Sequence, residues 1–415
     1  KQGQNGGPLT NEQAGAEFYN TIFYVVESRH EQGTIWTGSD DGLVHITRDE
    51  GGSWDNVTPK GLKETQINAI EVSPHNPAKA YLAVTGYKMN DFKPYIYVTE
   101  NYGRAWKRLD KGLPEDTFVR VVREDPVREG LLYAGTEAGM FVSFDAGKNW
   151  QSLEQNLPPV PITDLTIRQG DLVAATQGRG FWVMDNLSPL RQVQAGDSKE
   201  DLKLYQPMDT AQISGGGGRG EFNGRNPTRG LEIFYYLDED LSSPLSIDIL
   251  NANDQVVRTY SSEEREIDRC ILSNMDQRSP FSLSYPSTKK GLNRWVWNFG
   301  RNELNCVFDI TMFHGFGGAR VQPGDYKVRV SFGDESQTQS FSVLPDPRSN
   351  ATPDQYAALE ARIVEVTGLM NELLDGIGSM RATREQVKAL LKAQSDDEVI
   401  AVAQSAIDAI DAWEQ

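Results

Sequence analysis

Short apolar runs separated by turn residues fill the first 190 positions of the chain. Runs of this length, bounded by Gly, Pro, Asn, Asp and Ser, predict strands. They come in groups of three: residues 21–26, 34–37 and 43–46, then 67–72, 80–84 and 95–98, then 118–122, 131–134 and 140–142. This grouping predicts a repeated β unit.

The third run of each group is followed by the pattern Ser/Thr-x-Asp/Asn-x-Gly-x-x-Trp, and the tryptophans are spaced by 52 and 44 residues. The Asp or Asn suits an Asx-turn, the Gly a positive φ, and the Trp the space between neighbouring sheets. We therefore interpret these residues as structural, with a fourth strand starting at each Trp. The three copies are Thr47, Asp49, Gly51 and Trp54; Thr99, Asn101, Gly103 and Trp106; and Ser143, Asp145, Gly147 and Trp150.

Four strands in a unit of about 45 to 50 residues are typical of a β-propeller blade. A fourth unit, with runs at 162–167, 172–175 and 181–184, has neither the Gly nor the Trp of the pattern and lacks a fourth strand. Fewer than four complete blades do not make a typical ring of four to eight blades. We therefore interpret residues 1–192 as the C-terminal blades of a propeller and expect further blades upstream of Lys1.

The rest of the chain changes character twice. Residues 193–228 contain a glycine tract and are interpreted as a linker, because a phosphate-binding loop would need a strand, a helix and a Lys-Ser/Thr pair around it. Alternating runs over 229–347 predict a β-sandwich of the immunoglobulin or fibronectin III kind. Residues 348–415 show helical three–four spacing and are expected to be truncated, with further helix starts at the capping boxes of Thr383 and Ser395. We expect these helices to pack on the other domains; a partner-binding coiled coil is the alternative.

The amino-acid composition argues against several classes of function. The net charge is −18, which argues against nucleic-acid binding and against adhesion to anionic membranes. No apolar run approaches the roughly 20 residues of a membrane-spanning helix. The two cysteines and four scattered histidines do not form a zinc-binding pattern, and the Asp40–Asp41 pair supplies too few oxygens for Ca²⁺. We therefore expect neither a metal nor a cofactor.

The repeated pattern resembles the Asp-box, or bacterial neuraminidase repeat, family. Residues 38–42, 118–126 and 174–182 resemble more specifically the large secreted bacterial proteins with sortilin-like propellers, often named "glycosyl hydrolase" by analogy. The resemblance implies a propeller and an extracytoplasmic location, whether periplasmic, cell-surface or secreted. In an exported protein the two lone cysteines, Cys270 and Cys306, indicate one disulfide. The Asp-box also occurs in sialidases, xyloglucanases and sortilin receptors, so it marks a fold and leaves the function open.

Propeller ligands usually lie on the face formed by loops between second and third strands. These loops bring carboxylates and cations to one rim, where they would hold a peptide terminus or sugar hydroxyls, or serve only as solvated turn residues. The long loop around Asp91 is the least needed for structure and is our preferred functional segment. The rim residues are Asp40, Asp41, Lys88, Asp91, Lys93, Glu137 and Arg179.

Two hypotheses of different class follow. The first is an exported, non-catalytic propeller that binds a protein, peptide or glycan. The second is a glycoside hydrolase, sialidase- or xyloglucanase-like, acting on a polysaccharide with Asp41 and Glu137 as weak catalytic candidates. Such an enzyme needs two carboxylates about 5 to 9.5 Å apart, and the Arg-Ile-Pro segment of sialidases is absent here.

Overall fold

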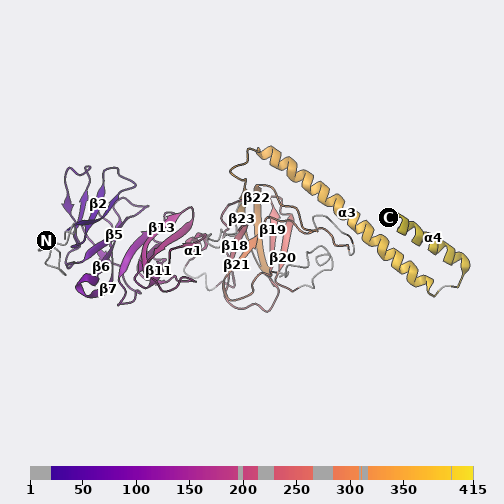
Figure 1. Ribbon diagram of the computed structural model, residues 1–415, viewed down its shortest axis with the longest axis horizontal. Coiled ribbons are helices and arrows are strands. Elements are labelled where there is room, and N and C mark those ends of the chain that lie inside the picture. The colour runs from indigo at the N-terminus through magenta and orange to yellow at the C-terminus, as the bar shows by residue number, and fades with distance from the viewer. Residues whose placement is uncertain are drawn as a thin grey trace. The chain divides into compact units, whose positions relative to one another are not determined.

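The computed structural model describes residues 20–194, 200–213, 229–264, 284–307, 310, 316–393 and 395–414. The chain divides into two compact units, Lys1–Val193 and Gln194–Gln415. The fold is mainly β, built from small antiparallel sheets, with two helices near the C-terminus (Figure 1). In the described part of the chain, no helix is long and apolar enough to cross a membrane.

The first unit contains four sheets in which each strand pairs with the next one along the chain. Three sheets have four strands and the fourth sheet has three, as the grouping of apolar runs predicts. The sheets are β1 (Ile22–Glu27), β2 (Ile35–Ser39), β3 (Val44–Thr47) and β4 (Asp55–Asn56); β5 (Gln66–Val72), β6 (Ala80–Gly86), β7 (Asp91–Thr99) and β8 (Lys107–Arg108); β9 (Val119–Glu124), β10 (Leu132–Thr136), β11 (Gly139–Ser143) and β12 (Gln151–Ser152); and β13 (Ile162–Arg168), β14 (Asp171–Thr176) and β15 (Phe181–Met184). The short helix α1 (Ser188–Gln192) ends the unit.

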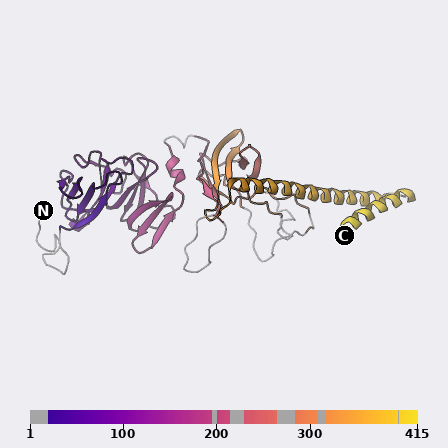
Figure 2. The same cartoon turned by 90° about the horizontal axis from the view of Figure 1, so that it is seen from above.

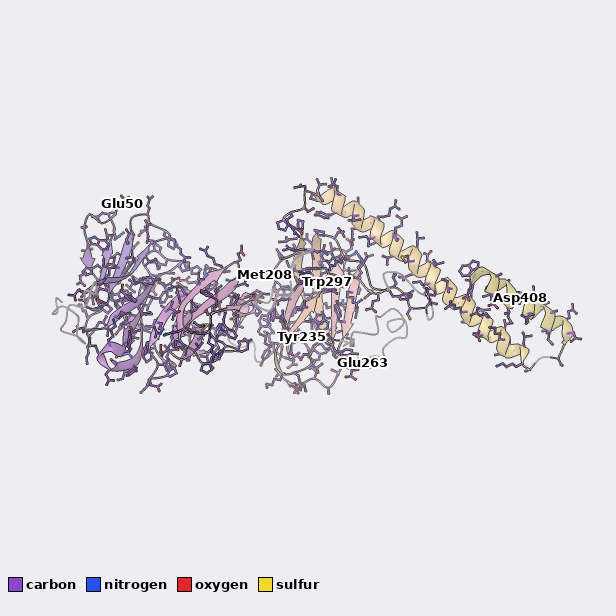
Figure 3. The ribbon with its side chains drawn as sticks, viewed as in Figure 1. Glu50, Met208, Tyr235, Glu263, Trp297 and Asp408 are labelled. Atoms are coloured by element: carbon purple, nitrogen blue, oxygen red, sulfur yellow. The ribbon has the colours of Figure 1, made fainter. Side chains whose placement is uncertain are left out.

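The turn after the third strand has the same hydrogen bonds in all three complete sheets. In the first, the Thr47 hydroxyl donates to Asp49 and accepts from the backbone N–H of Gly51, while Asp49 accepts from the backbone N–H of Ser53. Two consecutive residues have positive φ, Glu50 at 59° and Gly51 at 93° (Glu50 is labelled in Figure 3). The turn is therefore held by local hydrogen bonds.

The tryptophans that follow the turns join neighbouring sheets. The indole N–H of Trp106 donates to the carbonyl of Val57, just after β4, at 2.6 Å, and that of Trp150 donates to the carbonyl of Leu109, just after β8, at 2.8 Å. Trp54, in the first sheet, is 44% exposed. Trp106 and Trp150 therefore each bond to the end of the preceding sheet.

The first strands of the four sheets meet at Arg123 of β9. Its guanidinium donates to the hydroxyl of Tyr24 in β1, and to the carboxylate of Asp164 and the carbonyl of Leu165 in β13. It also lies 3.6 Å from the carboxylate of Glu71 in β5. One side chain therefore ties its own sheet to the other three.

Two sheets of the second unit share one apolar core. One has the order β16–β18–β21 and the other β17–β23–β22–β19–β20. Trp297 and Tyr235 are fully buried in this core (Figure 3). The strands are β16 (Leu202–Leu204), β17 (Thr210–Ala211), β18 (Leu231–Leu237), β19 (Ser246–Asn251), β20 (Val256–Ser261), β21 (Gly291–Trp297), β22 (Gly324–Phe332) and β23 (Glu335–Leu344).

The helical segment forms a hairpin of α3 (Pro353–Leu391) and α4 (Asp397–Glu414), held partly by ion pairs of Arg384 with Asp411 and Glu414 (Figure 2). Thr352 caps α3 through a capping box with Gln355. The predicted helix start at Thr383 is wrong, because α3 continues through it and the Thr383 hydroxyl donates to the carbonyl of Ser379 one turn earlier.

Several predictions concern residues that lie partly outside the described ranges. Cys270 lies outside them and Cys306 within, so the disulfide between these two cysteines stays a prediction. Residues 200–213 of the predicted linker contain β16, whose Leu202 and Leu204 are buried in the core of the second unit, and β17. The division into four domains also stays a prediction.

Candidate functional site

The loops between second and third strands occupy equivalent places in three of the four sheets of the first unit. In each, a backbone N–H in this loop donates to the carbonyl of a residue at the start of the first strand: Asp40 to Thr21, Glu137 to Phe118 and Gln177 to Pro161. The predicted rim residues in these loops therefore lie at the same end of their sheets.

The two aspartates of the first loop hold the chain in place. The Asp40 carboxylate accepts from the backbone N–H groups of Asn20 and Thr21. Asp41 is 1% exposed and accepts a hydrogen bond from the hydroxyl of Ser39. The buried Asp41 is thus part of the turn, and its catalytic assignment stays a prediction.

The second sheet carries an insertion in this loop. The backbone forms a 3₁₀ turn over Tyr87–Met89, followed by Asn90 in the left-handed conformation at φ 58°. Asp91 then accepts hydrogen bonds from the hydroxyl of Tyr95 at 2.7 Å and the backbone N–H of Lys93 at 3.2 Å. Burial and, after it, the bond to Asp91 raise the pKa of Tyr95 to about 12. Asp91 therefore braces the loop, with Lys88 half-buried and Lys93 exposed.

Aromatic rings from this insertion stack on the third sheet. Tyr87 stacks on Phe118 with ring centroids 5.2 Å apart and planes at 20°, and Phe92 contacts Phe118 at 6.4 Å. Phe118 is buried, whereas Tyr87 is 40% exposed and Phe92 47% exposed. The insertion thus exposes two aromatic side chains to solvent, and both pack against the buried Phe118 ring.

An ion pair lies beside these rings. The guanidinium of Arg120 lies 5.2 Å from the ring centroid of Phe118 and donates through Nε and Nη2 to Oε2 of Glu137, at 2.7 and 2.6 Å. The carbonyl of Arg120 accepts from the amide of Asn68 in the second sheet. We call Tyr87, Phe92, Phe118, Arg120 and Glu137 the aromatic surface.

Arg179 is the remaining rim residue, in the hairpin between β14 and β15. Its side chain is exposed, and its carbonyl accepts from the indole N–H of Trp182. Of the predicted rim residues, Glu137 belongs to the aromatic surface through its pairing with Arg120.

Sequence reasoning selected the loop around Asp91 but did not name Phe92, Phe118 or Arg120. Phe118 and Arg120 are two residues apart at the start of a strand, so they share a face. That period-two relationship was the available signal. The contact with Tyr87 joins different sheets, and no local pattern reveals it.

No protein-family model and no curated protein sequence matches the chain. Among solved structures, the chain is similar to YCF48 bound to a D1 peptide, at 20% identity over 40% of this chain and 52% of that one, with a TM-score of 0.31. The chain is also similar to the GH74 xyloglucanase of Xanthomonas campestris, at 14% identity over 59% of this chain and 36% of that one, with a TM-score of 0.33. The GH74 enzyme of Niastella koreensis gives 13% identity over 53% and 36%, TM-score 0.33. The chain thus spans about half or less of these structures, and likeness at this level carries no argument about activity.

Proposed function

We propose that the first unit is part of an exported β-propeller that binds a peptide or a glycan at the aromatic surface without transforming it. The four consecutive sheets and the tryptophans that join them support the propeller. The shared core of the two later sheets supports a sandwich that serves as a structural annex. The extracytoplasmic location rests on the resemblance to secreted Asp-box proteins.

One observation carries the proposal: Tyr87 and Phe92 stay 40% and 47% exposed while both contact the buried Phe118. An aromatic side chain offers a large apolar area that gains free energy when a ligand removes it from water. Side chains already fixed by packing lose little conformational entropy on binding. The surface is therefore suited to recognition.

The catalytic alternative receives less support from the side chains. A glycoside hydrolase needs two carboxylates that reach one substrate. Asp41 is buried in its turn, and Glu137 is paired with Arg120. We therefore rank binding above hydrolysis.

Peptide and glycan arrays test the proposal, with the Tyr87→Ala/Phe92→Ala double variant beside the unchanged chain. Trp413→Ala is the matched control, because Trp413 is 54% exposed but lies on α4. We expect array signals that disappear in the double variant and persist in the control. Signals that survive the double variant would contradict the proposal, and release of reducing sugar from a bound glycan would favour the hydrolase.

A further inference from the structure

Both side chains of the Arg120–Glu137 ion pair are partly exposed to water. The Arg120 side chain is 22% exposed and that of Glu137 is 38% exposed. An ion pair with this access to solvent contributes little net free energy. Another carboxylate can therefore replace Glu137 at little cost.

The guanidinium is well placed to take such a replacement. Its planar donors match a carboxylate, and its position over the Phe118 ring restrains its movement. The same Phe118 ring supports Tyr87 from another sheet. A carboxylate bound to Arg120 would consequently lie next to an aromatic surface that accepts an apolar side chain.

The local charge is compatible with an anionic ligand although the chain as a whole is acidic. The net charge is −18, but Lys88 lies in the same 3₁₀ turn as Tyr87. Lys88, Lys93 and Arg120 thus supply three cations from the segments that build the aromatic surface, against the carboxylates of Glu137 and Asp91, and the Asp91 carboxylate already accepts a hydrogen bond from the Tyr95 hydroxyl.

We infer that the ligand of the aromatic surface is a peptide in which a carboxylate adjoins a large apolar side chain, and that Glu137 occupies Arg120 until this carboxylate replaces it. The inference rests on the proposed function, since it names the ligand class of the same surface. Glu137 is then an internal competitor, and its removal improves binding.

The test begins with a bead-displayed heptapeptide library, counter-selected against the Tyr87→Ala/Phe92→Ala variant. We expect enriched peptides to carry Asp or Glu beside Phe, Leu, Ile or Trp. The most enriched peptide is then labelled with fluorescein and compared, by fluorescence polarisation, with a second peptide in which each Asp or Glu is replaced by Asn or Gln.

Three variants separate competition from general charge effects. Glu137→Gln is expected to tighten binding of the acidic peptide about three- to tenfold, and Arg120→Met to weaken it about tenfold, with thermal unfolding as a check on the fold. Asp110→Asn is the control, because Asp110 also pairs with a guanidinium, Arg108, that lies over an aromatic ring, Tyr95, at 4.4 Å. It makes the same change in net charge and is expected to leave the affinity unchanged.

The outcomes distinguish this inference from the proposed function. Binding that depends on Tyr87 and Phe92 but not on the peptide's carboxylates, or that Glu137→Gln leaves unchanged, overturns the inference and retains the proposed function. The inference is also overturned if the library yields no enriched peptide and an oligogalacturonide binds the aromatic surface instead. The ligand would then be an acidic glycan. If no peptide or glycan distinguishes the chain from the double variant, both fail.

Discussion

The guanidinium of Arg123 lies 3.6 Å from the carboxylate of Glu71, although the two residues belong to different sheets. Both side chains are largely buried, and Arg123 also contacts Tyr24 and Asp164. Burial raises the pKa of Glu71 to about 7, because the loss of hydration outweighs the favourable charge of Arg123. The centre of the first unit therefore contains a carboxyl group that titrates near neutrality.

Glu71 makes stability depend on pH. The folded protein holds the Glu71 proton up to about pH 7, whereas the ordinary pKa is 4.5, so the free energy of unfolding falls as pH rises through this window. Glu71→Gln removes that fall and is expected to be more stable than the unchanged chain at pH 8, but not at pH 4.5. Urea unfolding at both pH values checks this, and equal pH slopes for the two proteins would contradict it.

The tryptophans of the repeated turn are predicted to differ in their contribution to stability. Trp150 is 5% exposed and bonds to Leu109, whereas Trp54 is 44% exposed. Trp150→Ala is expected to lower the free energy of unfolding by about 3 to 5 kcal/mol, and Trp54→Ala by less than about 1 kcal/mol. Similar losses for both variants in chemical denaturation would show that the contact between sheets is not the source of the difference.

Two threonines of the helical hairpin provide a matched pair. Thr352 caps α3, so Thr352→Ala is expected to cost about 1 kcal/mol. Thr383 lies inside α3 and bonds to the preceding turn, so Thr383→Ala is expected to be neutral or slightly stabilising. Helix content followed by circular dichroism during thermal unfolding measures both, and a larger loss at Thr383 would indicate a helix boundary there.

The sequence predicted the repeated sheets well, because their determinants are local. Thr47, Asp49 and Gly51 bond within one turn, so the same spacing recurs wherever that turn recurs. The apolar or alternating runs of residues, and the turn residues between them, likewise predicted the positions of the strands. The error at Thr383 has a physical cause: a Thr-x-x-Gln sequence caps a helix only where the backbone leaves the helical conformation.

The candidate site could be predicted only in part. The loop around Asp91 was recognisable as an insertion, but its stacking on Phe118 depends on how two sheets pack. The burial of Asp41 and the pairing of Glu137 with Arg120 also depend on neighbouring strands. From the sequence, the charged turn residues were therefore predicted to form an exposed ligand-binding rim. In the structure, several of them hydrogen-bond to the backbone or form ion pairs instead.

Isothermal titration of the tightest array ligand tests the central claim, that the aromatic surface binds the ligand. Truncation of aromatic anchors at an interface commonly costs about 2 kcal/mol or more, which corresponds to roughly 30-fold in Kd. We predict at least this loss for Tyr87→Ala/Phe92→Ala and an unchanged Kd for Trp413→Ala. An unchanged Kd for the double variant, with its fold intact, would place the binding site elsewhere and contradict the account.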